Sequence, residues 1–362
     1  MASGIKQSFK RLVLNCPEWL LRKIVVGRRL SSKPNEIDEC IDLFYGEEMV
    51  PDSDRASLKK AIHRDMLEHL ITPDEYFLYD FASKTEAEKH EFVGDLERTV
   101  LCARLYNSNP AGMVFMDKMK TYEVFRDYFK REVIQIKSEA DFEGFSQFVS
   151  SHDQYMVKPV AASRGNGIRK EIAPRTDDEV RAAFKVLLEA GPCVLEELID
   201  QDPRIAQLHP QSVNTIRYAT YLDDEQVHTI ACFIKIGRGE SVIDNGGAGG
   251  FLAAVDEATG KIITPGRTEF DEVIEVHPDT GIPLVGFQIP EWEEMLKLVK
   301  ELPTVLPEQK YVGWDLALSE TKGWVLVEGN SGGQFVGPQI SKGQGIRSLV
   351  DETFGSMQSL GL

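Results

Sequence analysis

Residues 324–334 read WVLVEGNSGGQ, an apolar strand that runs into a carboxylate, a glycine and an amide. Side chains two apart on a strand point to the same face, so Glu328 and Asn330 present carboxylate and amide oxygens to one point in space. Such oxygens are the ligands that a hard divalent cation such as Mg2+ prefers. The stretch therefore predicts a metal site at the end of a buried strand.

The residues that precede this stretch predict its partner strand. Residues 311–328 read as two strands joined by a turn at residues 320–323, which would bring Asp315 directly opposite Glu328. Two acids held together in this way repel each other unless cations or protons intervene. For Asp315 alone, a hairpin with solvated acids is favoured. The shared face of Asp315, Glu328 and Asn330 favours a site for Mg2+, with Mn2+ as the alternative metal.

A lysine and a glycine-rich turn give a second indication of a ligand site. Lys158 ends the apolar run at residues 155–158 and is followed by the turn AASRGNGIRK at residues 161–170. Such a turn can present backbone amides to phosphate oxygens. For Lys158 itself, an exposed position at a sheet edge is the alternative. Neither GxxxxGK[ST] nor GxGxxG occurs in the chain. The run CVLEELI at residues 193–199 then ends a strand in two acids, Glu196 and Glu197, whose backbone could meet an adenine edge and whose carboxylate could meet a ribose.

Two arginines and a second glycine-rich segment are further candidates. Arg217 shares a strand face with the small residues Thr215 and Ala219, and it could hold a γ-phosphate by bidentate contacts or form a salt bridge to an acid of the sheet. Arg238, in the loop Gly-Arg-Gly, is predicted to bind substrate or phosphate. Residues 242–250 (VIDNGGAGG) could form a lid or an amide-lined pocket, or simply a flexible connection. His277 could supply a base, but a histidine that caps a loop is favoured.

The pattern along the chain indicates an α+β fold. Residues 1–110 are predicted to be mainly helical, because apolar residues recur at helical spacing within residues 37–44, 58–70 and 92–105. Residues 107–112 (NSNPAG) have turn chemistry and predict a domain boundary. Strands are predicted at residues 133–136, 155–158, 168–172, 193–198, 214–222, 227–236, 251–255, 310–318 and 324–328, and helices at residues 177–190 and 291–302.

The order of these pieces resembles the ATP-grasp superfamily, whose fold consists of two α+β subdomains that clasp ATP. The resemblance covers about residues 111–335 and implies ATP and Mg2+, with two ions expected. Beside the helical region predicted at residues 1–110, it implies a subdomain at residues 111–192 with the phosphate lysines and glycine-rich loop, and a C-terminal subdomain at residues 193–362 with the metal site. The implied nucleotide ligands are Lys118 (with Lys120 as the alternative), Lys158, Ser163, Arg164, Gly165, Asn166, Gly167, Glu196, Glu197 and Leu198. The implied metal ligands are Asp315, Glu328 and Asn330, and the implied catalytic residues are Arg217, Arg238 and Lys118.

A narrower resemblance, to the sugar-transfer-associated ATP-grasp family, lies between residues 212 and 334. It is carried by six short runs: VNTIR at 213–217, FIKIGR at 233–238, VIDNGGAGG at 242–250, HPDTG at 277–281, IPEW at 289–292 and GWD at 313–315. This family is linked with exopolysaccharide or capsule gene sets, so the resemblance implies a role in polysaccharide biosynthesis. The N-terminal α/β lobe that is usual in the superfamily is not evident in the sequence.

Composition and charge restrict the partners. The net charge of −17 argues against nucleic-acid binding, and the five widely spaced cysteines predict reduced thiols in a cytoplasmic protein. Residues 1–33 carry eight Lys or Arg against one Glu, and their apolar residues recur at helical spacing. This segment could contact an anionic membrane peripherally, or pack on the protein's own acidic body, which is favoured. No apolar run is long enough to span a bilayer, and the segment does not resemble a secretory signal.

These observations predict an ATP- and Mg2+-dependent ligase that joins a carboxylate to an amine or another nucleophile through an acyl phosphate. A kinase that phosphorylates a small-molecule hydroxyl is the first alternative, and a non-catalytic nucleotide-binding protein is the second. The sequence leaves open the identity of both substrates, which could belong to glycan or amino-acid metabolism, and the oligomeric state.

Overall fold

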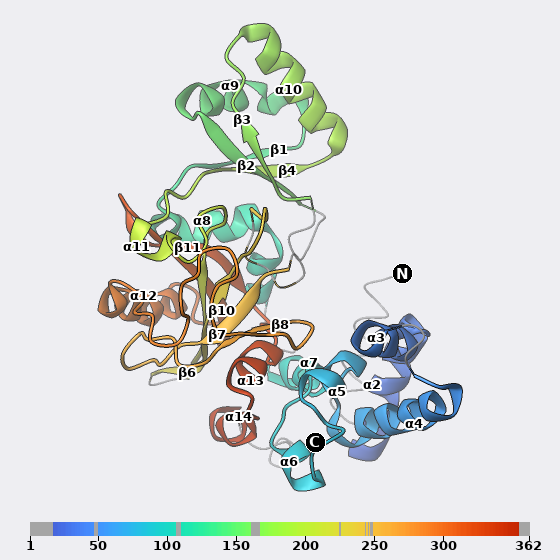
Figure 1. Cartoon of the computed structure of the whole chain (residues 1–362). Coiled ribbons are helices and arrows are strands. Elements are labelled where there is room, and N and C mark those ends of the chain that lie inside the picture. Colours follow the sequence, from blue (N-terminus) through green and yellow to red (C-terminus); the bar gives the residue numbers. More distant parts are fainter. Residues whose placement is uncertain are drawn as a thin grey trace. The chain divides into compact units, whose positions relative to one another are not determined.

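The chain divides into two compact units. The computed structural model describes residues 17–46, 50–105, 110–160, 167–223, 226–242, 244, 246 and 249–354. Unit 1 contains residues 1–109, 264–273 and 332–362, and unit 2 contains residues 110–263 and 274–331. Figure 1 labels the elements of both units, and their mixture of helices and sheets confirms the predicted α+β class. The predicted divisions near residues 110 and 192 stay predictions.

Unit 1 is mainly helical. Its helices are α2 (Glu18–Ser32), α3 (Glu36–Tyr45), α4 (Asp52–His69), α5 (Pro73–Leu78), α6 (Glu86–His90), α7 (Asp95–Leu105), α13 (Val336–Lys342) and α14 (Arg347–Phe354). The three helices predicted here are present as α3, α4 and α7, but two of the predicted starts are wrong. Helix α4 begins six residues earlier than predicted, since Pro51 and the acids of its first turn favour a helix N-terminus there. Helix α7 begins only after Gly94, where a side chain would collide with the carbonyl oxygen of Leu70 at 2.2 Å.

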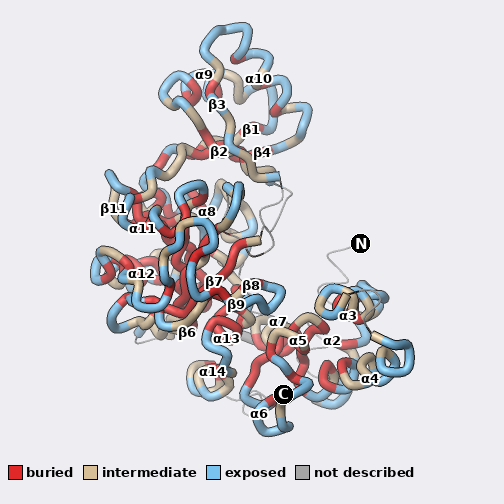
Figure 2. The backbone as a smooth tube through the Cα atoms, in the orientation of Figure 1, coloured by how far each residue is buried: buried red, intermediate tan, exposed pale blue. Residues whose placement is uncertain are grey.

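The C-terminal helices of unit 1 pack against its N-terminal part. Helix α13 is buried along most of its length (Figure 2). Its Gln339 side chain accepts a hydrogen bond from the Val93 amide at 2.8 Å and donates one to the Val93 carbonyl at 2.9 Å. Arg347, at the start of α14, forms a partly buried bidentate ion pair with Glu97. Segments more than two hundred residues apart in sequence therefore share one core.

Helix α2 contains the described part of the basic N-terminal segment. Its Leu21 and Val25 are buried within unit 1, and Arg22 donates to the backbone carbonyl of Glu68 in α4 at 2.7 Å. Trp19 remains 62% exposed. Residues 1–16 lie outside the described residues, so peripheral membrane contact stays a prediction. Among the described helices, none has the length and apolar character needed to cross a membrane.

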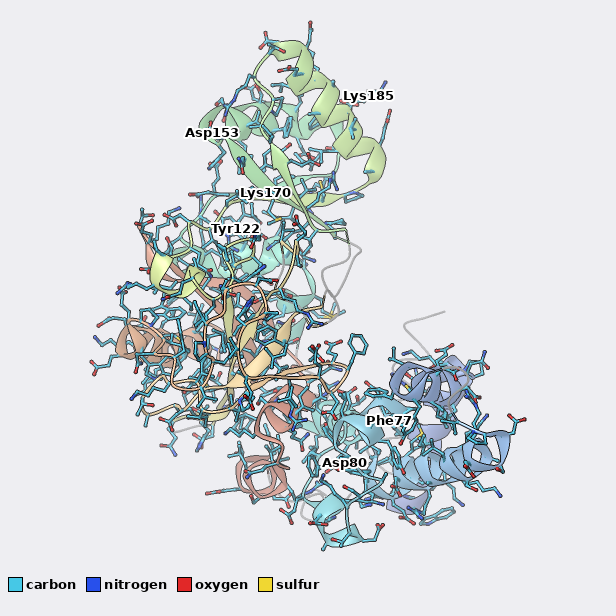
Figure 3. All side chains as sticks on the ribbon, in the orientation of Figure 1. Phe77, Asp80, Tyr122, Asp153, Lys170 and Lys185 are labelled. Atoms are coloured by element: carbon cyan, nitrogen blue, oxygen red, sulfur yellow. The ribbon has the colours of Figure 1, made fainter. Side chains whose placement is uncertain are left out.

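Unit 2 contains a small antiparallel sheet with two faces of different character. Its strands follow the order β1 (Val133–Ile136), β4 (Cys193–Glu197), β2 (Gln154–Pro159) and β3 (Arg169–Ile172). Helices α9 (Phe142–Ser151) and α10 (Asp177–Ala190) form a core with the face that carries Tyr155, Val157 and Leu195. Asp153, Lys170 and Lys185 are exposed to solvent (Figure 3). Because side chains alternate along a strand, Lys158 and Glu196 lie on the face opposite to these helices.

The larger sheet of unit 2 is also two-faced. Its strands in this unit follow the order β11 (Gly323–Asn330), β10 (Tyr311–Ser319), β5 (Thr215–Leu222), β6 (Val227–Ile236) and β7 (Phe251–Ala254), all antiparallel. One face is apolar, with Ile216, Ile234 and Trp314, and it packs against α8 (Lys118–Phe129) and α12 (Trp292–Val305). The other face carries Arg217, Lys235 and Asp315. The register pairs Asp315 with Arg217, and it pairs Lys235 with Thr215, which shares a face with Arg217 because the two are two residues apart on β5.

The remaining short elements complete the chain. They are η1 (Pro110–Met116), η2 (Glu139–Asp141), α11 (Pro203–Ala206), β8 (Gly266–Thr268) and β9 (Val273–Ile274). Every strand predicted from the sequence is present, and so are the helices at residues 177–190 and 291–302, the second of which continues to Val305. Helices α8 and α9 were not among the predicted elements. In α8, Asp117 caps the N-terminus by accepting from the amides of Met119 and Lys120.

Candidate functional site

The hairpin of β10 and β11 brings Asp315 directly opposite Glu328, as predicted. The predicted four-residue turn is wrong, because Ser319 pairs with Gly323 and only three residues lie between them. A β-bulge restores the register: Leu316 pairs with Leu326, whereas Asp315 pairs with Glu328, which leaves Val327 as the extra residue.

The bulge decides which face of the sheet carries Glu328. Without the extra residue, the register set by the turn would pair Glu328 with Trp314, whose side chain belongs to the apolar core. A shift of one residue moves every following side chain to the other face. The bulge at Val327 therefore places Glu328 and Asn330 on the face of Asp315.

Packing on the apolar face explains why the residue between Glu328 and Asn330 is a glycine, Gly329. A side chain there would lie 2.6 Å from the Phe115 ring and 3.2 Å from the Trp314 indole. Phe115 and Trp314 pack edge to face, with ring centroids 5.8 Å apart. The strand end thus has a polar face with Glu328 and Asn330, and an apolar face that admits only glycine.

Two cations from neighbouring strands hold Asp315. Arg217 donates from Nε and Nη2 to the two carboxylate oxygens at 2.6 and 2.7 Å, and Lys235 Nζ lies 3.2 Å from Oδ2. Burial alone would raise the pKa of Asp315, but Arg217 and Lys235 outweigh it and lower this pKa to about 2. The salt bridge that the sequence left as an alternative for Arg217 is therefore present, and it involves a predicted metal ligand.

Lys235 and Asp244 are members of this cluster that sequence reasoning did not single out. Asp244 is buried, accepts from the backbone amide of Thr215 at 3.0 Å and from its hydroxyl, and lies 3.9 Å from Lys235. Burial raises the pKa of Asp244, and Lys235 and Thr215 offset this in part. The usable signal for Lys235 was a charged residue inside the otherwise apolar run at residues 227–236. Asp244 anchors the described part of the second glycine-rich segment to β5.

Glu328 and Asn330 differ from Asp315 in their surroundings. Glu328 is exposed, and it has no hydrogen bond or ion pair among the residues that the structure describes. Burial lowers the pKa of Arg217, and the nearby Asp315 raises it. The charge of Glu328 adds a smaller increase to the same pKa. Asn330 pairs across the hairpin with Gly313, where an added side chain would lie 3.4 Å from Arg217. This set of oxygens, next to a position without a side chain, fits the preferences of Mg2+.

Lys158 is connected to the strand of Glu328 by a chain of buried contacts. Lys158 Nζ lies 2.8 Å from Glu196 Oε1, and Arg131 donates to Glu196 Oε2 from Nε at 3.1 Å and from Nη2 at 2.7 Å. Arg131 also donates to the backbone carbonyls of Leu326 and Val327. Burial would raise the pKa of Glu196, but Lys158 and Arg131 lower it to about 2.

The other predicted nucleotide ligands of this region have separate surroundings. Glu197 pairs with Lys322 and accepts a hydrogen bond from the Glu132 amide. Its carboxylate is partly exposed, whereas Glu196 is buried. Leu198 follows β4 and is half-buried. Gly167 has a positive φ of 72° and closely approaches Pro159. Ser163, Arg164, Gly165 and Asn166 lie outside the described residues.

Lys118 occupies the first position of α8, directly after the cap residue Asp117. It is half-buried, whereas Lys120 is exposed and lies 4.0 Å from Asp117. The preceding segment contacts the end of β11, since Ser331 donates to the carbonyl of Gly112 at 3.3 Å. Lys118 thus lies on a segment attached to the strand end that carries Glu328 and Asn330.

Two histidines hold the turn that carries Arg238. His277 Nε2 lies 2.9 Å from the Gly237 carbonyl, and its Nδ1 accepts from the Asp279 amide, which requires a neutral ring. His209 Nε2 lies 3.0 Å from the Gly239 carbonyl. Burial lowers the pKa of His277. His277 therefore caps a loop, the reading that the sequence favoured, and both of its ring nitrogens are engaged.

The chain is similar to a known protein family and to several solved structures. The profile described as "Sugar-transfer associated ATP-grasp" matches residues 98–354. The search of curated proteins finds no match. Solved structures to which the chain is similar include D-alanyl-alanine synthetase A from Vibrio cholerae O1 biovar eltor, at 10% identity and a TM-score of 0.39, covering 69% of this chain and 63% of that one. N5-carboxyaminoimidazole synthetase from Staphylococcus aureus, complexed with ADP, has 10% identity and a TM-score of 0.37, covering 67% and 52%.

A complex of the ATP-grasp ligase PsnB has 14% identity and a TM-score of 0.42, covering 80% of this chain and 73% of that one. The chain spans slightly less than two thirds of the V. cholerae enzyme. The family profile covers well over half of the chain, and its residues include both sheets of unit 2. The chain belongs to the sugar-transfer associated ATP-grasp family and has the ATP-grasp fold of that family.

Proposed function

We propose that this protein is an ATP-dependent ligase that joins a carboxylate to an amine or a related nucleophile. The observation that carries the proposal is the pairing of Asp315 with Glu328 on one sheet face, beside the cations Arg217 and Lys235. Acids and cations that are held together on a rigid sheet suit phosphoryl transfer, in which positioning and charge neutralisation carry the catalysis. The family match supports a ligase-like use of ATP.

In the proposed reaction, a substrate carboxylate oxygen attacks the γ-phosphorus, and the bond to the β–γ bridging oxygen breaks to release ADP. The amine then attacks the carbonyl carbon of the acyl phosphate, the bond between that carbon and the oxygen attached to phosphorus breaks, and inorganic phosphate leaves with this former carboxylate oxygen as the amine loses a proton. Lys118, Lys158, Lys235, Arg217 and Arg238 would neutralise phosphate charge. The glycine-rich segments would exclude water from the acyl phosphate.

Asp315, Glu328 and Asn330 would hold Mg2+, and two ions are proposed. Bound there, the metal would screen the phosphate charge and orient the triphosphate. Glu328 is suited to this role because it is accessible and has no competing partner among the described residues. Asp315 would share its oxygens with Arg217 and Lys235. The family description favours a sugar-linked or glycan-linked substrate, and a role in polysaccharide biosynthesis is part of the proposal.

The test is a screen for ADP and phosphate release with Mg-ATP. Amino acids, sugar acids and amino sugars are supplied singly and as acid–amine pairs. Equal amounts of ADP and phosphate, formed only when both partners are present, are expected of a ligase. Addition of hydroxylamine with the acid alone should give a hydroxamate, because it traps the acyl phosphate. ADP without free phosphate, together with a phosphorylated product, would identify a kinase and overturn the proposal. A protein that forms no product in this screen and does not bind Mg-ATP in calorimetry would be non-catalytic.

A further inference from the structure

Strand β11 lies at one end of the larger sheet, so its outer carbonyls have no neighbouring strand. Two consecutive residues, Lys130 and Arg131, donate to carbonyls along this edge and in the turn that precedes it. Lys130 Nζ donates to the carbonyls of Lys322 and Trp324, both at 3.1 Å. Arg131 donates from Nη1 to the Leu326 carbonyl at 2.6 Å and from Nη2 to the Val327 carbonyl at 3.2 Å.

The contacts of Arg131 depend on the bulge. In a regular strand, consecutive carbonyls point in opposite directions, so one side chain on one edge cannot bond both. The carbonyls of Leu326 and Val327 meet the same guanidinium because the bulge turns the backbone between them. Arg131 therefore stabilises the extra residue that places Glu328 opposite Asp315.

The other side of the same guanidinium binds Glu196. The Arg131 side chain is 2% exposed and that of Glu196 is 8% exposed, so the ion pair is buried. Glu196 in turn contacts Lys158. The planar fork of an arginine can bond a carboxylate and two carbonyls at once, whereas a lysine ammonium offers a single point of charge.

We propose that Arg131 is a positioning residue for the metal and nucleotide site. It fixes the face on which Glu328 lies and, through Glu196, fixes Lys158 relative to Glu328. Arg131 itself would contact neither the metal nor ATP. This inference rests on the proposed function, because it concerns the residues that would hold Mg2+.

The test measures Mn2+ binding, by the loss of the free-ion electron paramagnetic resonance signal, in the presence of a saturating non-hydrolysable ATP analogue. Arg131→Lys keeps the charge beside Glu196 but cannot span both carbonyls. It is expected to weaken Mn2+ binding by about 10-fold or more, the usual effect of removing a residue that orients a metal ligand. The matched control is Lys130→Met, which removes the contacts to the carbonyls of Lys322 and Trp324, away from the bulge, and should leave Mn2+ affinity within about twofold.

A double-mutant cycle separates positioning from general stability. If Arg131 acts through Glu328, Arg131→Lys should have little further effect on Mn2+ binding in a Glu328→Gln background. The proposal is overturned if folded Arg131→Lys binds Mn2+ as the wild type does, or if its effect is equally large in both backgrounds. Should Arg131→Lys fail to fold, Glu196→Gln provides the test: a smaller loss in the same direction is expected, and wild-type affinity would overturn the proposal.

The same data distinguish failure of this inference from failure of the proposed function. If the wild type does not bind Mn2+ with the nucleotide analogue, or if Glu328→Gln binds it equally well, then the metal assignment itself is wrong. If Glu328→Gln loses binding while Arg131→Lys does not, only the role of Arg131 is wrong.

Discussion

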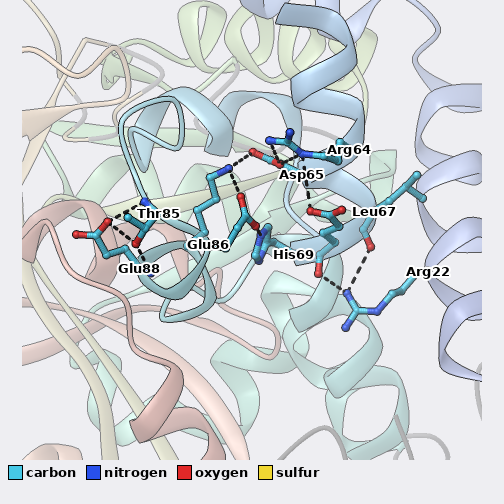
Figure 4. A network of polar contacts seen from close by, with 10 residues as sticks. Arg22, Arg64, Asp65, Leu67, His69, Thr85, Glu86 and Glu88 are labelled. Carbon is cyan, nitrogen blue, oxygen red and sulfur yellow. Dashed lines mark hydrogen bonds and ion pairs between the residues drawn. The ribbon is translucent and has the colours of Figure 1, made fainter.

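Two clusters of charged side chains, one in each unit, resemble each other in composition. In unit 1, the fully buried Asp65 contacts Lys89 at 2.8 Å and Arg64 at 2.9 Å, and Glu86 contacts both Lys89 and His69 (Figure 4). In unit 2, the buried Asp315 contacts Arg217 and Lys235. Each cluster therefore has a buried aspartate held by two cations, with further acids nearby.

The clusters differ in what their remaining acids face. Asp65, Glu68, His69 and Glu86 have ligand atoms within 4.8 Å of one another, which is close enough for a metal. The ammonium of Lys89, however, already bridges Asp65 and Glu86. In unit 2, Glu328 is exposed and has no such partner among the described residues. Lys89 thus supplies the positive charge that a metal would bring to the unit 1 cluster, whereas Glu328 has no such partner among the described residues and is the better candidate for a metal ligand.

The largest effect on stability should come from breaking the buried pair of unit 1. Lys89→Met leaves Asp65 buried with a weaker set of partners, and the free energy of unfolding should fall by about 3 kcal/mol or more. Urea unfolding measures the loss, and calorimetry should show unchanged affinity of the folded protein for Mg-ATP. A loss below about 1 kcal/mol, or a change in nucleotide affinity, would contradict the purely structural role of this cluster.

The next effect is on activity and concerns the accessible acid of unit 2. If the proposed metal site is right, Glu328→Gln should lower turnover by about 100-fold or more, because an amide replaces the negative charge of the proposed metal ligand. Unfolding free energy should change by less than about 0.5 kcal/mol, since the side chain is exposed. The matched control is Glu68→Gln, an exposed acid of the unit 1 cluster, which should retain full turnover. Wild-type turnover in Glu328→Gln would count against the metal site.

A smaller effect should come from the glycine between the polar residues. Gly329→Ala places a methyl group 2.6 Å from the Phe115 ring, so the unfolding free energy should fall by about 1–3 kcal/mol. Combining it with Phe115→Leu should recover part of the loss. In contrast, Gly27→Ala in helix α2 of unit 1 meets nothing within 4 Å and should stabilise by about 0.5–1 kcal/mol. Equal effects at the two glycines would show that the packing around Gly329 is not restrictive.

The smallest effect is a pH dependence that both units should share. Burial lowers the pKa of His277 in unit 2 and of His69 in unit 1. The unfolded chain then binds protons more readily, so stability is full above about pH 6.5 and falls as the pH drops toward the lowered folded-state pKa values. Each histidine contributes at most about 1.4 kcal/mol per pH unit in that window. His277→Gln and His69→Gln should each flatten the decline, measured by urea unfolding between about pH 5 and 7. A wild type whose stability is constant over this range would contradict both assignments.

Local pattern predicted much of unit 2 because its strands are short, apolar and separated by turn residues. The strands at residues 133–136 and 227–236 and the helix at residues 177–190 agree with the structure at both ends. Helices α8 and α9 escaped prediction. Helix α9 carries Phe142, Phe145, Phe148 and Val149 at helical spacing, a signal that the sequence analysis did not use, whereas α8 contains a kink at Phe125. The opposition of Asp315 and Glu328 was predicted correctly for a partly wrong reason, since a shorter turn and a bulge replace the longer turn.

The sequence by itself determined the fold class, the approximate positions of the strands and the presence of Asp315, Glu328 and Asn330 at the end of one hairpin. These features follow from alternation and turn chemistry, which act between residues close along the chain. Only the tertiary structure decided that Arg217 and Lys235 neutralise Asp315, that Arg131 joins Glu196 to the bulge at Val327, and that Lys89 fills the acid cluster of unit 1. Partners far apart along the chain meet only when strands and helices pack, and a buried charge takes whichever opposite charge that packing brings within reach.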